Sequence, residues 1–145
     1  MSKGNTFENE LLSLIFANSN IANIGDATGL RGSSTAGSLY AALHTGDPGE
    51  AGDQTTSECS YTSYARVAVA RSGAGWTVTG NSVSPAANVD FPAATGGSQT
   101  ATHFSIGTSS SGAGKILYKG TISPNISISS GVQPRLSTAT TITED

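Results

Sequence analysis

The sequence has 145 residues and a formal net charge of −3. This length is typical of one domain and is enough to bury a hydrophobic core without disulfide or metal cross-links. Charged residues make up 12 % of the chain, against roughly 25 % in a typical globular protein, and serine and threonine take their place. The seven Lys and Arg residues are scattered and form no basic stripe, so direct binding to nucleic acid is not expected.

Two further features bear on the cellular setting. Cys59 is the single cysteine, so no intrachain disulfide can form, and a free thiol is typical of a protein assembled in reducing cytoplasm. The apolar stretch from Leu11 to Ala17 is interrupted by Ser13 and lacks a small-residue cleavage site. We therefore expect neither a signal peptide nor a membrane span.

The N-terminal segment predicts a short amphipathic helix over residues 6–17, followed by a loop to about residue 37. Asn5 and Glu8 have the spacing of a capping box. The loop is indicated by a high density of asparagine and glycine from Asn18 onward. Apolar side chains that recur at helical spacing, and that we expect to form an interface with another protein, are Phe7, Leu11, Leu14 and Ile15. The alternative is that this helix caps the chain's own β domain.

From residue 38 onward the pattern has the period of two that is typical of strands. Ser38 to Thr45 predicts a strand that enters a type II turn at Asp47-Pro48-Gly49. Tyr64 to Arg71 alternates with apolar residues on both faces, which favours a central strand. Further short strands are expected at 75–78, 88–91, 102–106, 115–118, 126–128 and 138–143.

These strands, separated by turn residues, indicate an all-β fold: an antiparallel β-sandwich or jelly-roll-like barrel with one short N-terminal α-helix. We expect residues 1–37 to serve for attachment or oligomer contact and residues 38–145 to form the β domain. A single core is expected from one face of the 64–71 strand together with the large aromatic residues. Its members are Val67, Val69, Trp76, Phe91 and Phe104.

Two motifs invite a chemical interpretation and fail on their spacing. The segment from Gly107 to Lys115 resembles a phosphate-binding loop, but the lysine is out of register and Ile116 follows it. It is better explained as a hairpin loop. His44 and His103 are the only histidines, and no nucleophile elbow or zinc-binding pair accompanies them. We expect both to be ordinary strand residues, with His44 fixing the adjacent turn through hydrogen bonds.

Three other groups of residues have weak functional alternatives. Asp47, Glu50 and Asp53 share one loop and could supply oxygen ligands to calcium, although a solvated acidic loop is favoured. Asp90 and Glu58 are the only carboxylates that could be paired for glycoside hydrolysis. The aromatic residues around Trp76 could stack on a carbohydrate, but core packing is the simpler interpretation. We therefore expect no enzymatic activity, cofactor or metal site.

Several segments together resemble a family of small virion proteins of tailed bacteriophages, described variously as tail-fibre-like, minor structural or capsid decoration proteins. The similarity extends from Leu39 to the C-terminus, and Ser63 stands where that family usually has glycine. The segments that carry it are 39–49, 61–71, Gly75-Trp76, 88–92 and 102–107.

The resemblance implies a structural protein of the phage particle that is assembled in the bacterial cytoplasm. Capsid decoration is the first expectation, because a compact β domain suits a knob that binds the major capsid protein and stabilises the assembled head, commonly as a homotrimer. The alternatives are a protein associated with the tail or tail fibre, and a module that binds a host receptor or glycan. No contact with nucleic acid or membrane is expected.

Overall fold

A computed structural model of the chain describes residues 2–25 and 29–145. The chain divides into two compact units. Unit 1 comprises Met1–Ser38, Val69–Asn88 and Ser137–Asp145, and unit 2 comprises Leu39–Ala68 and Val89–Leu136. Each unit is thus assembled from segments that are distant in the sequence. The assignment of residues 1–37 to attachment and 38–145 to a β domain stays a prediction.

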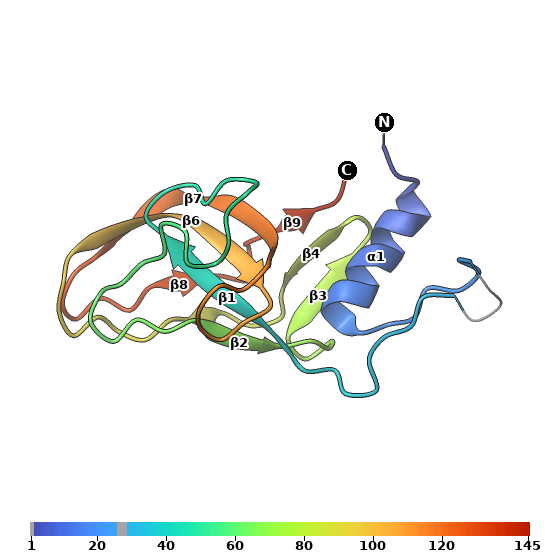
Figure 1. Cartoon of the computed structure of the whole chain (residues 1–145), viewed down its shortest axis with the longest axis horizontal. Helices are drawn as coiled ribbons and strands as arrows, with labels where there is room; N and C mark the ends of the chain where they lie inside the picture. Colours follow the sequence, from blue (N-terminus) through green and yellow to red (C-terminus); the bar gives the residue numbers. More distant parts are fainter. Residues whose placement is uncertain (1, 26–28) are drawn as a thin grey trace. The chain divides into compact units, whose positions relative to one another are not determined.

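Unit 1 is a helix packed on a small antiparallel sheet. Helix α1 (Asn5–Ala17) lies against β3 (Trp76–Thr79) and β4 (Ser82–Pro85) (Figure 1). The short strand β9 (Ile142–Thr143) completes the sheet in the order β3-β4-β9. Phe16 of α1 meets Trp76 of β3 edge to face, with ring centroids 4.8 Å apart. Both rings are buried, so this aromatic pair belongs to the core of unit 1.

The two ends of α1 are stabilised by different contacts, and the N-terminal end lacks the capping box expected from the sequence. The N-cap is Gly4 and makes no side-chain cap hydrogen bond, so the capping box expected from Asn5 and Glu8 is wrong. The C-terminal end has no basic residue of its own. Instead, the guanidinium of Arg71 donates hydrogen bonds to the carbonyl oxygens of Leu14 (2.5 Å) and Ile15 (2.7 Å). A positive charge there stabilises the negative end of the helix dipole.

The loop that follows α1 is crossed by one isolated β-bridge between Ile21 and Leu30. Its side chains help to close it, because Asn18 accepts a hydrogen bond from the backbone N–H of Ser33 and donates one to the Ser33 carbonyl. Residues 26–28 of the expected 18–37 loop lie outside the described residues.

Unit 2 is built around an antiparallel sheet with the strand order β2-β1-β6-β7 (Figure 1). The division between the two units falls within β2 and just after the first residue of β1. The four strands are β1 (Ser38–His44), β2 (Val67–Ala70), β6 (Gln99–Gly107) and β7 (Ile116–Ile128). Strands β5 (Val89–Asp90) and β8 (Arg135–Leu136) pair separately.

The expected central strand is wrong in both length and position. Only Val67–Ala70 of the 64–71 segment is strand, and β2 stands at the end of the strand order. The physical reason lies in Tyr64 and Arg66, whose side chains are drawn into a polar network with Glu58. A segment with those contacts does not continue as a flat strand, although its alternation resembles one.

The predicted core residues are only partly buried together. Phe91 and Phe104 are buried in unit 2, while Trp76 is buried in unit 1. Val67 and Val69 share one face, as expected, but both are only half-buried. The expectation of a single core that includes both valines is therefore corrected. The side chains of an edge strand have a neighbouring strand on one side only, so they are less buried than those of a central strand.

The all-β class is confirmed, with one short N-terminal helix and antiparallel sheets. The strands expected at 115–118 and 126–128 are one strand, β7, which is interrupted by register shifts. Strands β4 and β8 were not expected from the sequence. In the described part of the chain, no helix has the length and apolar character needed to cross a lipid bilayer.

Candidate functional site

Helix α1 presents two different sets of side chains. The stripe buried against the sheet of unit 1 consists of Glu8, Leu12 and Phe16. The four residues expected from the sequence to form an interface lie on a second face, turned from the first by roughly 120° at about 100° per residue. Phe7 is 36 % exposed, whereas Leu11, Leu14 and Ile15 are half-buried. We call these four residues the second apolar face of α1; their role as an interface stays a prediction.

A buried ion pair organises unit 2. The side chain of Arg66 is 2 % exposed and donates two hydrogen bonds to the carboxylate of Glu58, at 2.6 and 2.8 Å. The hydroxyl of Tyr64 donates a third to the same carboxylate, at 3.0 Å. The bond to Glu58 raises the pKa of Arg66, and burial raises the pKa of Tyr64. Arg66 is therefore charged and fixed at any ordinary pH.

The remaining donors of Arg66 fix the glycine- and serine-rich hairpin loop between β6 and β7. They bind the carbonyl oxygens of Ser109 (3.0 Å) and Gly112 (2.8 Å). Gln54 is fully buried, accepts the N–H of Ser109 and donates to the carbonyl of Tyr40. The backbone of the loop is thus fixed by hydrogen bonds to two side chains, those of Gln54 and Arg66.

Two glycines that flank most of this loop, Gly107 at the end of β6 and Gly114 near the end of the loop, have a packing role. A Cβ atom at Gly107 would lie 2.2 Å from the Gln54 side chain, and one at Gly114 would also lie 2.2 Å from it. Such distances are far below van der Waals contact, so a side chain at either position would displace Gln54 from its buried place. The resemblance to a phosphate-binding loop is explained by these contacts, and the hairpin connection expected from the sequence is confirmed.

His44 is fully buried at the end of β1. Its Nδ1 lies 2.8 Å from the carbonyl oxygen of Thr56, and its Nε2 lies 2.8 Å from the hydroxyl of Ser105, which is also fully buried. Burial lowers the pKa of His44. The pair has the distance of a serine–histidine dyad, but a carbonyl stands where an acid would be needed and the hydroxyl is closed off from solvent. His44 therefore ties β1 to the 56–57 segment and to β6.

His103 has a different setting in the neighbouring strand. It stands opposite His44 in the pairing of β1 with β6, and its Nδ1 lies 2.9 Å from the hydroxyl of Thr102. Both histidines are strand residues, as expected.

The acidic 47–53 loop is neutralised in part by a lysine of β7. Lys119 Nζ lies 3.0 Å from Asp47 and 3.6 Å from Glu50. Asp47 also accepts the backbone N–H of Gly49, and this bond, followed by that from Lys119, lowers the pKa of Asp47. Asp53 points its carboxylate at Thr55. Among the described residues, no group of three or more His, Cys, Asp and Glu is placed to hold a metal ion.

The two carboxylates that the sequence suggested as a hydrolytic pair are each bound to an arginine. Asp90 pairs with Arg135 across β5 and β8, and Glu58 pairs with Arg66.

Trp76 is buried on β3, where its Nε1 has no hydrogen-bond partner within the described residues. Its ring is thus part of the core and is not an exposed platform for a sugar.

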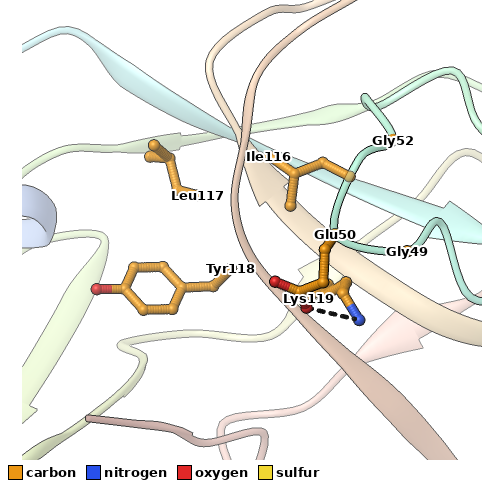
Figure 2. Close-up of a pocket in the computed structure, with 7 residues that line it drawn as sticks. All are labelled: Gly49, Glu50, Gly52, Ile116, Leu117, Tyr118 and Lys119. Atoms are coloured by element: carbon orange, nitrogen blue, oxygen red, sulfur yellow. Dashed lines mark ion pairs between the residues drawn. The ribbon is translucent and has the colours of Figure 1, made fainter.

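An open cavity of about 290 Å³ lies between the 49–52 loop and the first part of β7. Figure 2 shows the loop beside the strand, with Glu50 and Lys119 joined by their ion pair. Lys119 and Ile116 lie on the side of the loop, and Tyr118 projects to the other side. The lining residues are Gly49, Glu50, Gly52, Ile116, Leu117, Tyr118 and Lys119. This cavity had no counterpart in the sequence analysis.

The sequence matches a family model described as Podophage GP4 fiber I protein gp80, over residues 3–143. The match begins before α1 and ends at the last residue of β9, so it includes both units. The chain belongs to this family. It is accordingly a structural protein of a phage particle, in agreement with the resemblance carried by its sequence motifs. No curated protein sequence matches the chain.

In this fibre-family chain, the second apolar face of α1 was predicted from the sequence, but the contacts that shape unit 2 were not. Gln54, Glu58 and Lys119 were missed as structural groups. One signal was available: Arg66 stands within an otherwise apolar alternation, and a charge at such a position needs a buried partner.

Proposed function

We propose that this chain is a non-enzymatic structural protein that attaches to another protein of the particle through the second apolar face of α1. The observation that carries the proposal is that α1 has one face buried on the chain's own sheet and a second face that stays accessible. Glu8, Leu12 and Phe16 pack on the chain's own sheet, while Phe7 stays substantially exposed. An exposed phenylalanine next to three half-buried aliphatic residues gains free energy when a partner covers it.

We further propose that the attachment point is in the tail, at or near a fibre. The description of the matching family as a podophage fibre protein supports this location. The burial of the His44–Ser105 pair, which closes its hydroxyl off from a substrate, supports a role without catalysis. A homotrimer is part of the proposal, since three copies would multiply weak contacts along one axis.

Capsid decoration is the second candidate. The observation that favours it is the division of the chain into two units that are each compact, in which the described residues contain no repeated shaft-like segment. Such a protein would bind the major capsid protein and stabilise the assembled head by mass action. Particles that lack it would assemble but would release DNA at a lower temperature or after osmotic shock. Intact heat and shock resistance would contradict this candidate.

The copy number per particle separates the two locations. Quantitative mass spectrometry of purified particles should find a handful of copies for a fibre-associated protein and hundreds for a decoration protein. Hundreds of copies would refute the tail location.

Substitutions on α1 test the attachment surface. Phe7→Ser and Leu11→Ser should leave the chain folded and reduce its incorporation into particles, measured by complementing a phage that lacks the gene. Leu30→Ser is the matched control, because Leu30 is also an exposed apolar residue of unit 1, at 41 %. Leu12→Ser should instead destabilise the fold, since Leu12 is fully buried. Normal incorporation of both Phe7→Ser and Leu11→Ser would refute the proposed surface.

A further inference from the structure

Strand β7 forms one end of the four-stranded sheet of unit 2. In the order β2-β1-β6-β7, its neighbour is β6. Alternate residues of an antiparallel strand direct their N–H and C=O groups away from the neighbouring strand, so the outer side of β7 carries a row of groups able to pair with another strand. Natural proteins usually block such an edge.

The C-terminal half of β7 is blocked. Between the pairs His103–Thr121 and Ala101–Ile126, residues 122–125 of β7 stand opposite the single residue Thr102. This irregular, four-residue bulge contains Pro124, which has no N–H to donate. A strand added from outside could not keep its register past residue 121. The part of the edge that can accept a strand is therefore residues 116–121, which we call the open half of β7.

The open half also borders the cavity beside the 49–52 loop. Four of its residues, 116–119, line that cavity, and residues 116–120 are half-buried. The facing loop contributes Gly49 and Gly52, which have no side chains to fill the space (Figure 2). At about 290 Å³, the cavity is at the lower limit of ligand pockets. It is suited to one or two side chains of a strand that lies along the edge.

The charges around this groove favour a basic occupant. The side chain of Glu50 is 97 % exposed and that of Asp47 is 52 % exposed, and the ammonium of Lys119 lies within ion-pair distance of both. Two negative charges and one positive charge leave a net charge of −1. Glu50, which lies farther from Lys119 than Asp47 does, is available to pair with a cation.

A second copy of the chain is poorly suited to this groove. Most of its basic side chains already bind carboxylates or helix carbonyls; these are Lys3, Arg66, Arg71, Lys119 and Arg135. Of the seven in the sequence, Arg31 and Lys115 remain. Neither lies within a strand of the described structure. A second copy would also bring its own formal net charge of −3 to a groove that is already negative.

We propose that the open half of β7 binds an extended segment of another particle protein by strand addition, with a basic side chain of that segment paired to Glu50. Backbone hydrogen bonds would supply most of the affinity, and the cavity with Glu50 would supply the selectivity. This surface is distinct from the second apolar face of α1. The inference rests on the proposed function only in taking the partner to be a particle protein.

A synthetic strand peptide tests the binding mode directly. The probe is a capped hexapeptide of alternating threonine and valine with one central lysine, added at millimolar concentration to the isotope-labelled full chain. Nuclear magnetic resonance should show shifted amide signals at residues 49–52 and 116–121, with residues 126–128 unaffected. A second peptide carries N-methyl groups on the alternate amides that would face β7. It should not bind, because N-methylation removes the N–H groups that donate hydrogen bonds to β7.

Charge variants test the selectivity. Glu50→Gln should weaken binding of the lysine peptide by about two- to fivefold, the range of one exposed ion pair, and should leave a neutral peptide unaffected. Glu10→Gln is the matched control, since it removes the same charge from α1. Equal binding of the lysine peptide and a glutamate peptide would overturn the charge argument.

Three results would overturn the proposal as a whole. These are the absence of shifts at millimolar peptide, unchanged binding of the N-methylated peptide, and concentration-dependent self-association that protects the amides of residues 116–121. The last would assign the edge to a second copy. Phe7→Ser should bind the peptide normally. Loss of particle incorporation in that variant, with peptide binding intact, therefore separates the two surfaces.

Discussion

The buried pair of Arg66 and Glu58 offers the sharpest test of how unit 2 is held together. Arg66→Met replaces a guanidinium with an apolar side chain of similar length. The change removes two hydrogen bonds to Glu58 and those to the carbonyl oxygens of Ser109 and Gly112. Glu58, whose side chain is 17 % exposed, would keep its charge and lose its main partner.

The expected cost follows from burial. Breaking a buried ion pair by removing one partner typically costs about 3–5 kcal/mol, because an uncompensated charge stays in a low-dielectric environment. The partial exposure of Glu58 lets water recover some of that loss, which places the expectation near the lower end, at about 3 kcal/mol. The total stability of a domain is about 5–15 kcal/mol, so the variant should fold but unfold at a clearly lower denaturant concentration.

Urea unfolding followed by circular dichroism measures this difference, with Arg135→Met as the control. Arg135 pairs with Asp90, but both side chains are well exposed, at 51 % and 38 %. An exposed pair contributes about 0–1 kcal/mol. Hydrogen exchange should also be faster at residues 108–115 in Arg66→Met and unchanged there in Arg135→Met. If the two variants lose stability equally and the loop stays protected, the assignment of Arg66 as the group that fixes the loop is refuted.

Three further predictions concern the cores and the titrating groups. Phe104→Ala should cost about 3–5 kcal/mol and Val67→Ala clearly less, since Phe104 is buried and Val67 is half-buried; urea midpoints compare them. Burial lowers the pKa of His44, so the unfolded state binds more protons below about pH 6.5 and stability falls as the pH decreases from there. Urea midpoints against pH should show a shallower fall for His44→Gln than for His103→Gln. Burial raises the pKa of Cys59 to about 11, so its alkylation in the folded protein should be about a hundredfold slower than in urea.

The sequence predicted the elements whose signal is local. The helix at 6–17 and the strand at 38–45 differ from α1 and β1 by one residue at a boundary, because helical and strand periodicity directly reflect which side chains are buried. The type II turn at 47–49 agrees with the positive φ of Gly49, 73°, since that turn needs a positive φ at its third residue and glycine adopts it without strain. These features need no information about distant residues.

The errors concern features that depend on long-range pairing. The alternation of residues 64–71 contains the right residue types for a central strand, but their partners come from Glu58 and the 109–112 segment. Position in a sheet is decided by such partners and not by the strand's own sequence. The same argument applies to α1, where the face that packs includes a glutamate, Glu8, and the more apolar set is the one left accessible.

The glycine- and serine-rich loop shows most clearly how one sequence pattern can arise from two physical causes. A phosphate site needs glycine so that backbone N–H groups can approach an anion. Here Gly107 and Gly114 leave room for the buried side chain of Gln54, which occupies the space that a Cβ would need. The N–H of Ser109 is already bound to Gln54, and the carbonyls of Ser109 and Gly112 are bound to Arg66. A loop fixed from within in this way keeps one conformation without a ligand, and it places the start of β7, where the open half begins, at a constant position relative to the 49–52 loop.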